Sequence, residues 1–424
     1  MSDVVDLHGL LLPHLAPFDV SARLRPGTVV TGVSGRPELL EEQAHDLPDG
    51  PAGAEALAVR LRRRGARLRW VGGEVARSRR ALLALHREWG RGSVDVLRAD
   101  PSLLTELAVG GWLEAGVAAR AIRRVPWLAG VDGAFWSGVA AEATTEERRR
   151  LTRGYSALLY HRLAGESKPG QERLDLPPRR FDAQMQMLRR LGFSTLTTED
   201  LLARRGGQAG ARRAAVVTVD DALADIVEPL RRHAAMRPLV FVTTGAVGGQ
   251  AQWFDEEAVS TWEQLASLQH AGVELGGHTR SHVDLPTTDA ETARLEIAGS
   301  AEDLRDRLHV DPVAFAYPHG RWTGRERELV QRAGYSLAFT TQPGLNGAGT
   351  DPLALRRVSV KAWDTRLSFL WKVVTGEQPP RAWERWLLLR AGIGRRLARP
   401  RRSARARERE TARPAEAPLP PSEP

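Results

Sequence analysis

The 424-residue sequence contains no cysteine, so it has neither a disulfide framework nor a thiolate metal site. Any bound metal ion must therefore use histidines and carboxylates as ligands. No apolar run reaches the roughly 18–20 residues that a membrane-spanning helix needs. The first twenty residues do not resemble a signal peptide, because Asp3, Asp6, His8 and Pro13 interrupt the apolar run. We therefore expect a cytoplasmic protein, at most peripheral to a membrane.

Lysine is also scarce, and arginine carries almost all of the net charge of +9. Residues 376–424 hold much of this excess, and they are predicted to form a basic amphipathic helix followed by a disordered, proline-rich tail. Trp383 and Trp386 among the arginines are typical of a helix at a bilayer surface, although a helix packed on the preceding domain fits equally well. No specific nucleic-acid partner is expected, because no further aromatic residues are interleaved with the basic ones.

Residues 1–150 show alternating strand and helix patterns, which predict a smaller α/β domain with a parallel sheet. The expected strands are 27–35, 67–73 and 93–100, and the expected helices are 54–64 and 74–89. The sequence has neither a GxGxxG motif after a strand nor a Walker loop, so nothing indicates phosphate binding. A nucleotide- or sugar-binding role and a structural or docking role both remain open. A polar helix at 141–153 is predicted to connect this domain to the next.

Residues 151–375 repeat a strand, a loop and a helix several times, which predicts a single barrel-like domain. Two polar motifs follow predicted strands. Asp220 and Asp221 come after a β-branched apolar run, and His278 and His282 stand four residues apart in HTRSH. Two imidazoles and one carboxylate can bind a divalent metal ion, and the second carboxylate can accept a proton from water. Taken singly, the acids fit a helix cap and the histidines fit an ordinary loop. Both motifs should nevertheless face the same rim of a parallel barrel.

The order of YHR, TVDDA, HTRSH, FAYPHG and LRRV resembles the polysaccharide deacetylase family, the NodB-homology proteins of carbohydrate esterase family 4. The resemblance spans about residues 156–376 and includes the connecting segments. It implies a distorted (β/α) barrel that holds one divalent ion, usually zinc, with cobalt or nickel as alternatives. By this resemblance Asp221, His278 and His282 would be the metal ligands and Asp220 the general base. The backbone near His319 would donate to the oxyanion.

The sequence departs from the family pattern at four places. Ala222 replaces a glycine, which a Cβ tolerates only at negative φ. Ala316 replaces an arginine that braces the base, and Arg356 or Arg357 on the last strand is a candidate substitute. The Asp–Trp motif has no clear counterpart, because Trp363 and Asp364 come too late in the chain. The histidine of the usual Leu-x-His is absent as well.

The missing histidine leaves the general acid open. His161, at the end of the first barrel strand, is our first choice for the group that protonates the leaving amine, and His319 is the second. A structural histidine that is hydrogen-bonded at the strand end is the alternative for His161. The remaining candidates, His233, His270 and His309, are expected on the surface or in ordinary packing.

Two functions follow from these patterns. The first is metal-dependent hydrolysis of N-acetyl groups on the amino sugars of a cell-surface glycan or its precursor. The alternative is an inactive deacetylase-like barrel that binds a glycan or a lipid, which the missing family residues favour. An inactive homologue would have no chemical reason to keep the two aspartates and two histidines together, so the enzyme is the preferred interpretation.

Overall fold

The computed structural model describes most of the chain up to residue 380. The described residues are 4–11, 28–34, 43–44, 46–49, 51–64, 67–72, 79–105, 107, 109–110, 130–164, 175–205 and 213–380. The predicted amphipathic helix and tail after residue 380 lie outside these residues, so their contact with a membrane stays a prediction. Within the described ranges, no helix combines the length and the apolar character needed to span a bilayer.

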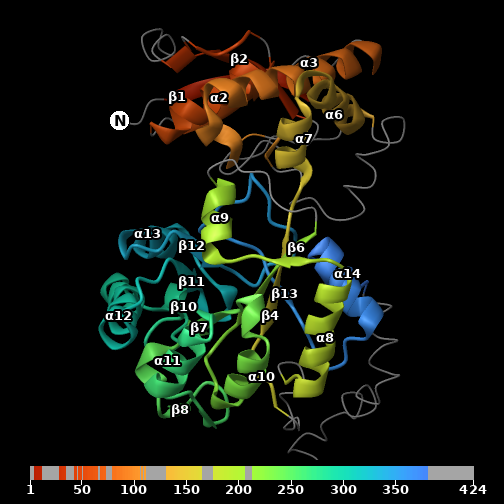
Figure 1. The fold of residues 1–424 in the computed structure, drawn as a ribbon. Helices are drawn as coiled ribbons and strands as arrows, with labels where there is room; N and C mark the ends of the chain where they lie inside the picture. The colour runs from red at the N-terminus through yellow and green to blue at the C-terminus, as the bar shows by residue number, and fades with distance from the viewer. Residues whose placement is uncertain are drawn as a thin grey trace, which may run out of the picture. The chain divides into compact units, whose positions relative to one another are not determined.

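The N-terminal region contains a three-stranded sheet in the order β2-β1-β3 together with several helices (Figure 1). Its elements are β1 (Val4–Leu11), β2 (Thr28–Ser34), α2 (Pro51–Arg63), β3 (Arg67–Gly72), α3 (Arg79–Ala99), α6 (Val131–Glu142) and α7 (Thr145–Thr152). β1 pairs with β3 in parallel but with β2 antiparallel. The expectation of a purely parallel sheet in this region is therefore wrong for the β1–β2 pair.

The segment 93–100, predicted as a strand, is instead the last part of helix α3. The apolar residues that suggested a strand continue a helical stripe, since Trp89, Val94 and Val96 are all buried in one cluster with residues of α6. Glycines allow the two helices to approach closely. A Cβ at Gly90 would lie 2.0 Å from the carbonyl oxygen of Phe135. This tertiary contact explains why a helix that contains glycine persists here.

The second region is built on a parallel sheet in the order β12-β11-β10-β7-β6-β4-β13, with β5 paired to β6. Its strands are β4 (Ser156–Tyr160), β5 (Ser194–Thr195), β6 (Ala214–Val219), β7 (Leu239–Val242), β10 (Glu274–Gly277), β11 (Ala314–Ala316), β12 (Leu337–Phe339) and β13 (Val358–Ser359). All neighbouring pairs are parallel. The strands alternate with helices along the chain, as the repeated pattern of residues 151–375 predicted.

The sheet curls, and its two end strands are joined through the residues just before β13. The N–H of Leu355 donates to Ala338 at 2.7 Å, and the N–H of Thr340 donates back to Leu355 at 2.8 Å. Two residues later the N–H of Arg357 donates to Gln342 at 3.0 Å. The chain then pairs with β4 on the other side. This connection makes the fold a distorted (β/α) barrel, as the family resemblance implied.

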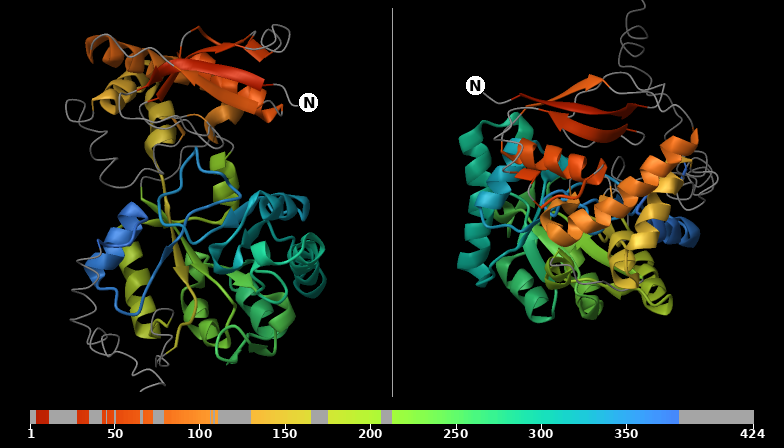
Figure 2. Two further views of the ribbon diagram at one scale, coloured as in Figure 1. Left: turned by 180° about the vertical axis from the view of Figure 1, so that it is seen from behind. Right: turned by 90° about the horizontal axis from the view of Figure 1, so that it is seen from above.

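Helices lie on the outer side of the curved sheet (Figure 1), and Figure 2 shows the same arrangement from behind and from above. They are α8 (Pro178–Arg190), α10 (Val227–Arg232), α11 (Trp262–His270), α12 (Ala290–Leu308), α13 (Gly324–Arg332) and α14 (Arg366–Thr375). Helix α9 (Thr198–Arg205) instead lies at one end of the barrel (Figure 1), where its Leu201 joins the interior core. Local signals in the sequence set several boundaries. Gly192, at φ 69°, follows the last turn of α8, and capping boxes of Thr261 with Gln264 and Thr323 with Glu326 begin α11 and α13.

The barrel strands are buried on both faces, so alternate residues enter two different cores. On β6, Ala214 and Val216 pack inside the barrel with apolar side chains of the other strands. Val217 and Val219 pack outside, against the helices. This alternation places Thr218, and next Asp220, on the interior face. The strand period therefore directs Asp220 into the barrel.

Candidate active site

Candidate catalytic residues from distant parts of the sequence meet at one end of the barrel. His161 directly follows β4, Asp220 and Asp221 follow β6, and His278 follows β10. These strands lie close together in the parallel sheet, so their carboxyl ends share one rim. The structure thus brings the two sequence motifs to the same place.

Asp221, His278 and His282 form a compact buried cluster. Each offers one ligand atom, and these atoms lie within 4.8 Å of one another. Oδ1 of Asp221 is 3.4 Å from Nε2 of His282 and 3.7 Å from Nε2 of His278. Separations of this size suit ligand atoms that surround a common cation.

The loop that carries both histidines is held by hydrogen bonds that fix the imidazoles. Nδ1 of His278 lies 2.8 Å from the carbonyl oxygen of Ala316 on β11, which orients Nε2 toward Asp221. Glu296 on α12 accepts the backbone N–H groups of Arg280 and Ser281 at 2.9 and 2.8 Å. It also accepts the Ser281 hydroxyl at 2.6 Å. Glu296 was not predicted, because nothing near it in the sequence distinguishes it from the other acids of α12.

Trp253 is a second unpredicted component of the cluster. Its indole N–H donates to Oδ1 of Asp221 at 3.0 Å. Its ring stacks on His282, with centroids 4.6 Å apart and an angle of 8° between the planes. One side chain therefore contacts two of the three proposed ligands. It comes from the short connection between β8 (Gln250–Ala251) and β9 (Glu257–Ala258), in which no sequence motif stands out.

The electrostatics of this cluster fit a cation. Burial, and then the neighbouring charge of Asp220, raises the pKa of Asp221 to about 7. Burial also lowers the pKa of His278, and it lowers that of His282 to about 2. A divalent ion would hold Asp221 ionised beside two neutral imidazoles, which are the protonation states that metal ligands need. Nδ1 of His282 is buried without a hydrogen-bond partner among the described residues. The donor set, two histidines and one aspartate, is one that zinc accepts with positions left open for water.

Asp220 is held by a bidentate ion pair with Arg357. The guanidinium donates to both carboxylate oxygens, at 2.6 and 2.8 Å, and both side chains are buried. Burial alone would raise the pKa of Asp220, but the charges of Arg357 and His278 outweigh it and lower the pKa to about 2. Asp220 therefore stays ionised at neutral pH.

Arg357 is the arginine that braces Asp220 in place of the one missing at Ala316. Of the two candidates on the last strand, Arg357 shares the interior face with Leu355, and it reaches Asp220. Its Nε donates to the carbonyl of Thr340 at 2.9 Å, and its guanidinium carbon lies 5.5 Å from the ring centre of Phe241. Arg357 also stands two residues after Leu355, where the family pattern Leu-x-His has its histidine.

Several residues of the site have backbone angles that favour glycine. Positive φ occurs at Asp221 (70°), Ala222 (51°), Thr279 (64°), His282 (57°) and His319 (57°). Ala222 does not have the negative φ that we expected a Cβ to require. It is fully buried, and its carbonyl accepts the N–H of Ser260 at 2.9 Å. Packing and hydrogen bonding thus hold the chain in a conformation that costs about 1–2 kcal/mol for such a residue.

The two proposed proton-transfer histidines lie differently. His161 is partly exposed, and burial of its ring lowers its pKa to about 4, although Asp220 acts in the opposite direction. His319 is exposed and sits at the turn after β11. Its ring meets that of His282 edge to face, with centroids 4.8 Å apart. Both residues are therefore beside the cluster.

The remaining sequence candidates lie in ordinary structural positions. His233 pairs with Asp182 at 2.8 Å, and Nδ1 of His270 contacts the carbonyl of Ala266 at 2.7 Å. His309 caps the C-terminus of α12 at φ 53°. Asp364 is buried and binds Lys372 at 2.5 Å, which fixes α14.

Comparison with known proteins agrees with this geometry. Residues 208–338 match the family model described as polysaccharide deacetylase. The chain is 24% identical over 207 residues to YxkH of Bacillus subtilis strain 168, which bears the name of a polysaccharide deacetylase. That alignment covers 48% of this chain and 70% of YxkH. The chain is also 25% identical over 236 residues to poly-β-1,6-N-acetyl-D-glucosamine N-deacetylase of Escherichia coli K12, covering 46% of this chain but only 35% of that protein.

Solved deacetylase structures are similar as well. The Streptococcus pyogenes deacetylase PplD, solved with acetate, matches with a TM-score of 0.46 and 22% identity, over 54% of this chain and 99% of that one. IcaB from Ammonifex degensii matches with a TM-score of 0.43 and 25% identity, over 51% and 94%. The barrel of this chain is therefore similar to the polysaccharide deacetylases, as the sequence resemblance implied.

Proposed function

We propose that residues 151–375 catalyse the metal-dependent hydrolysis of N-acetyl groups on amino sugars of a glycan or its precursor. The observation that carries this proposal is a buried Asp221–His278–His282 cluster beside an aspartate held by arginine. The N-acetyl-D-glucosamine polymer named for the E. coli relative supports a substrate of this chemical class.

Asp221, His278 and His282 would hold the ion, in the positions that the cluster defines. When bound, a divalent cation such as zinc lowers the pKa of a water molecule and polarises a carbonyl group. The contacts from Ala316 to His278 and from Trp253 to Asp221 fix the orientation of these side chains before any ion binds.

Asp220 would act as the general base that removes a proton from the attacking water. Its ion pair with Arg357 keeps it ionised at neutral pH and fixes both carboxylate oxygens. The same ion pair makes it a weak base, so Asp220 would need a water molecule that is already acidified. The role of Asp220 would therefore depend on the Asp221–His278–His282 cluster.

His161 would deliver a proton to the leaving amine. Since burial lowers its pKa to about 4, its imidazole is neutral at pH 7 and must first take up a proton. The negative charge of Asp220 is close enough to raise the pKa of His161. His161 would therefore be a nearby acceptor for the proton that Asp220 takes from water. The turn at His319, with its positive φ, would present backbone donors to the oxyanion.

The direct test is acetate release from N-acetylglucosamine oligomers by the full-length protein, with Asp220→Asn and His161→Gln as variants. Asp220→Asn should retain bound metal and lose activity by about 10²–10⁴-fold, the usual contribution of a general base. His161→Gln should lower kcat more than it raises KM. His233→Gln, which changes a histidine paired with Asp182 on the outside of the barrel, is the control.

The alternative is a barrel that binds a glycan without cleaving it. One observation favours it: both oxygens of Asp220 are already engaged by Arg357. Oligomers that bind to wild type and to Asp220→Asn with equal affinity, with no acetate released by either protein, would establish the binding role. Acetate release that depends on Asp220 would exclude it.

A further inference from the structure

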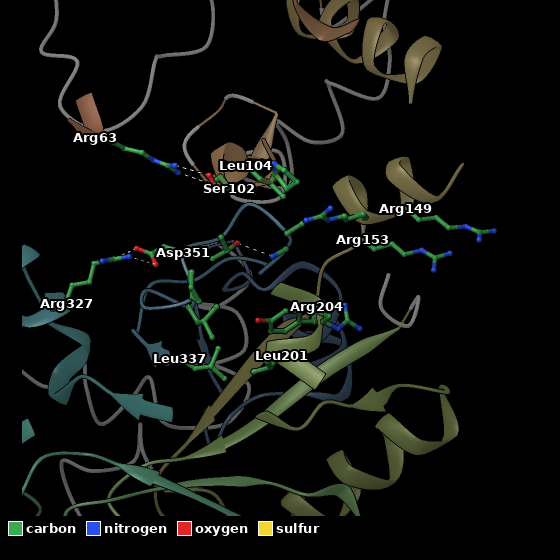
Figure 3. A pocket seen from close by; sticks show the side chains of 18 residues that line it. Arg63, Ser102, Leu104, Arg149, Arg153, Leu201, Arg204, Arg327, Leu337 and Asp351 are labelled. Carbon is green, nitrogen blue, oxygen red and sulfur yellow. Dashed lines mark hydrogen bonds and ion pairs between the residues drawn. The ribbon is translucent and has the colours of Figure 1, made fainter. Parts of the chain in front are cut away.

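Figure 3 shows the side chains that line a cavity of about 550 Å³. This cavity lies at the opposite end of the barrel strands from the candidate active site. Tyr155, immediately before β4, and Leu337, the first residue of β12, are among its walls. His161 stands at the other end of β4. Because a strand rises about 3.3 Å per residue, the five residues of β4 separate the two sites by roughly 17 Å. The cavity is therefore distinct from the metal-ligand cluster.

The walls of this cavity carry a large excess of positive charge. Six arginines line it, and among the described lining residues the only carboxylate is that of Asp351. Arg327 already binds that carboxylate through two nitrogens, at 2.7 and 3.1 Å. The other arginines are Arg63, Arg149, Arg150, Arg153 and Arg204. Crowded cations of this kind raise the local potential and attract an anion.

Two of the arginines, Arg150 and Arg204, have guanidinium nitrogens with no hydrogen-bond partner among the described residues. Arg204 on α9 is half-buried, lies 5.6 Å over the ring of Tyr155, and makes no hydrogen bond or ion pair with any described residue. Burial lowers its pKa, and the nearby charge of Arg153 acts in the same direction. Nε of Arg150 is buried, again with no partner in the described part of the chain. The buried Nε of Arg150 costs free energy unless a ligand satisfies it.

The remaining walls are largely apolar. Tyr155, Leu201, Leu337 and Leu355 lie on the barrel side of the cavity. A ligand that fills the space must therefore combine an anionic group with an apolar or ring-bearing part. The volume is in the range of pockets that bind small molecules.

We propose that this cavity binds a small organic phosphate or diphosphate. The planar, forked guanidinium matches the oxygen geometry of phosphate, and a phosphate group carries enough charge to compensate more than one arginine. A single carboxylate carries only one negative charge for the two guanidinium groups of Arg150 and Arg204. The phosphate lies against Arg150 and Arg204, and the organic part lies against Tyr155 and Leu201.

The test is calorimetric titration of the full-length protein with pyrophosphate, a nucleoside diphosphate and a short-chain isoprenyl diphosphate. The Asp221→Ala variant serves as the background, so that chelation of metal at the other site does not contribute. We expect one saturable pyrophosphate site per chain. Arg204→Gln should weaken it by about tenfold or more, the effect of losing a charge-assisted hydrogen bond. Arg332→Gln, an exposed arginine paired with Glu328, should leave it unchanged.

Comparing the two organic diphosphates shows which organic group lies against the apolar walls of the cavity. Tighter binding of the nucleoside diphosphate indicates a soluble nucleotide, and tighter binding of the isoprenyl diphosphate indicates a lipid-linked phosphate. If Arg204→Gln does not give a native circular dichroism spectrum, Arg150→Gln takes its place. Absence of saturable binding, equal affinity in the arginine variants, or organic ligands no tighter than pyrophosphate would overturn the proposal.

Discussion

Arg357 and Asp220 are 137 residues apart in the sequence and form a buried bidentate ion pair inside the barrel. The pair joins the residue just before β13 to the residue just after β6. It also takes the place of two features of the family pattern, the arginine missing at Ala316 and the histidine missing after Leu355. The side chain of Arg357 therefore links two parts of the barrel core and keeps the proposed base, Asp220, ionised.

Loss of Arg357 should destabilise the protein and stop the reaction. Arg357→Gln leaves the carboxylate of Asp220 buried without its cation, which typically costs about 3–5 kcal/mol of unfolding free energy. Urea unfolding measures this cost, and acetate release measures the activity. Arg356→Gln, which changes the neighbouring arginine, whose backbone N–H binds Asn346 outside this pair, is the control. A fully active and stable Arg357→Gln protein would contradict the assigned role.

Glu296 should control the affinity for metal without contacting it. Glu296→Ala removes the acceptor for two backbone N–H groups and one hydroxyl of the histidine loop, so His278 and His282 lose their fixed orientation. We expect metal affinity to fall by about 10–100-fold, as for other groups that orient ligands. Competition with a chelator measures it. Glu291→Ala, an exposed acid on the same helix paired with Arg294, should have no effect on metal affinity.

Trp253 should act through its N–H as well as its ring. Trp253→Phe keeps an aromatic ring over His282 but removes the hydrogen bond to Asp221, which helps to hold the carboxylate ionised. Metal affinity should fall by about tenfold or more, and Trp253→Ala should lower it further. Trp262→Phe, which alters a tryptophan packed on the outer core, is the matched control. Equal affinities for wild type and Trp253→Phe would show that the hydrogen bond has no role.

The buried pair of Lys372 and Asp364 should matter for stability and not for metal binding. Lys372→Met leaves the Asp364 carboxylate without its cation, at a cost of about 3–5 kcal/mol. The double variant with Asp364→Leu should recover part of this loss, because no buried charge then remains. Thermal unfolding of the two variants, with metal content measured in parallel, separates the two effects. A loss of metal in a folded Lys372→Met protein would contradict this view.

Much of the site could be predicted from the sequence because strand endings are local signals. The β-branched run before Asp220 and the apolar run before His278 both indicated strands, and parallel strands present their carboxyl ends on one rim. The supporting residues could not be found this way. Trp253 reaches Asp221 across 32 positions and Glu296 reaches Ser281 across 15, from segments with no distinctive pattern.

Other expectations depended on tertiary context. Arg356 and Arg357 are indistinguishable by type, and only the pairing of Leu355 with Ala338 fixes which of them faces the interior. The positive φ of Ala222 follows from burial and the contact with Ser260, which no local propensity reveals. In the N-terminal region, the packing of α3 against α6 through Gly90 made a helix of residues 93–100.

The central claim is that Asp221, His278 and His282 hold a divalent ion that the deacetylase reaction requires. The most direct measurement is metal content by elemental analysis, joined to acetate release from N-acetylglucosamine oligomers, for wild type and Asp221→Ala. We predict one ion per wild-type chain, loss of that ion in Asp221→Ala, and acetate release that chelation abolishes and zinc, cobalt or nickel restores. Wild-type protein that binds no metal, or that releases acetate equally well after the ion is removed, would contradict the account.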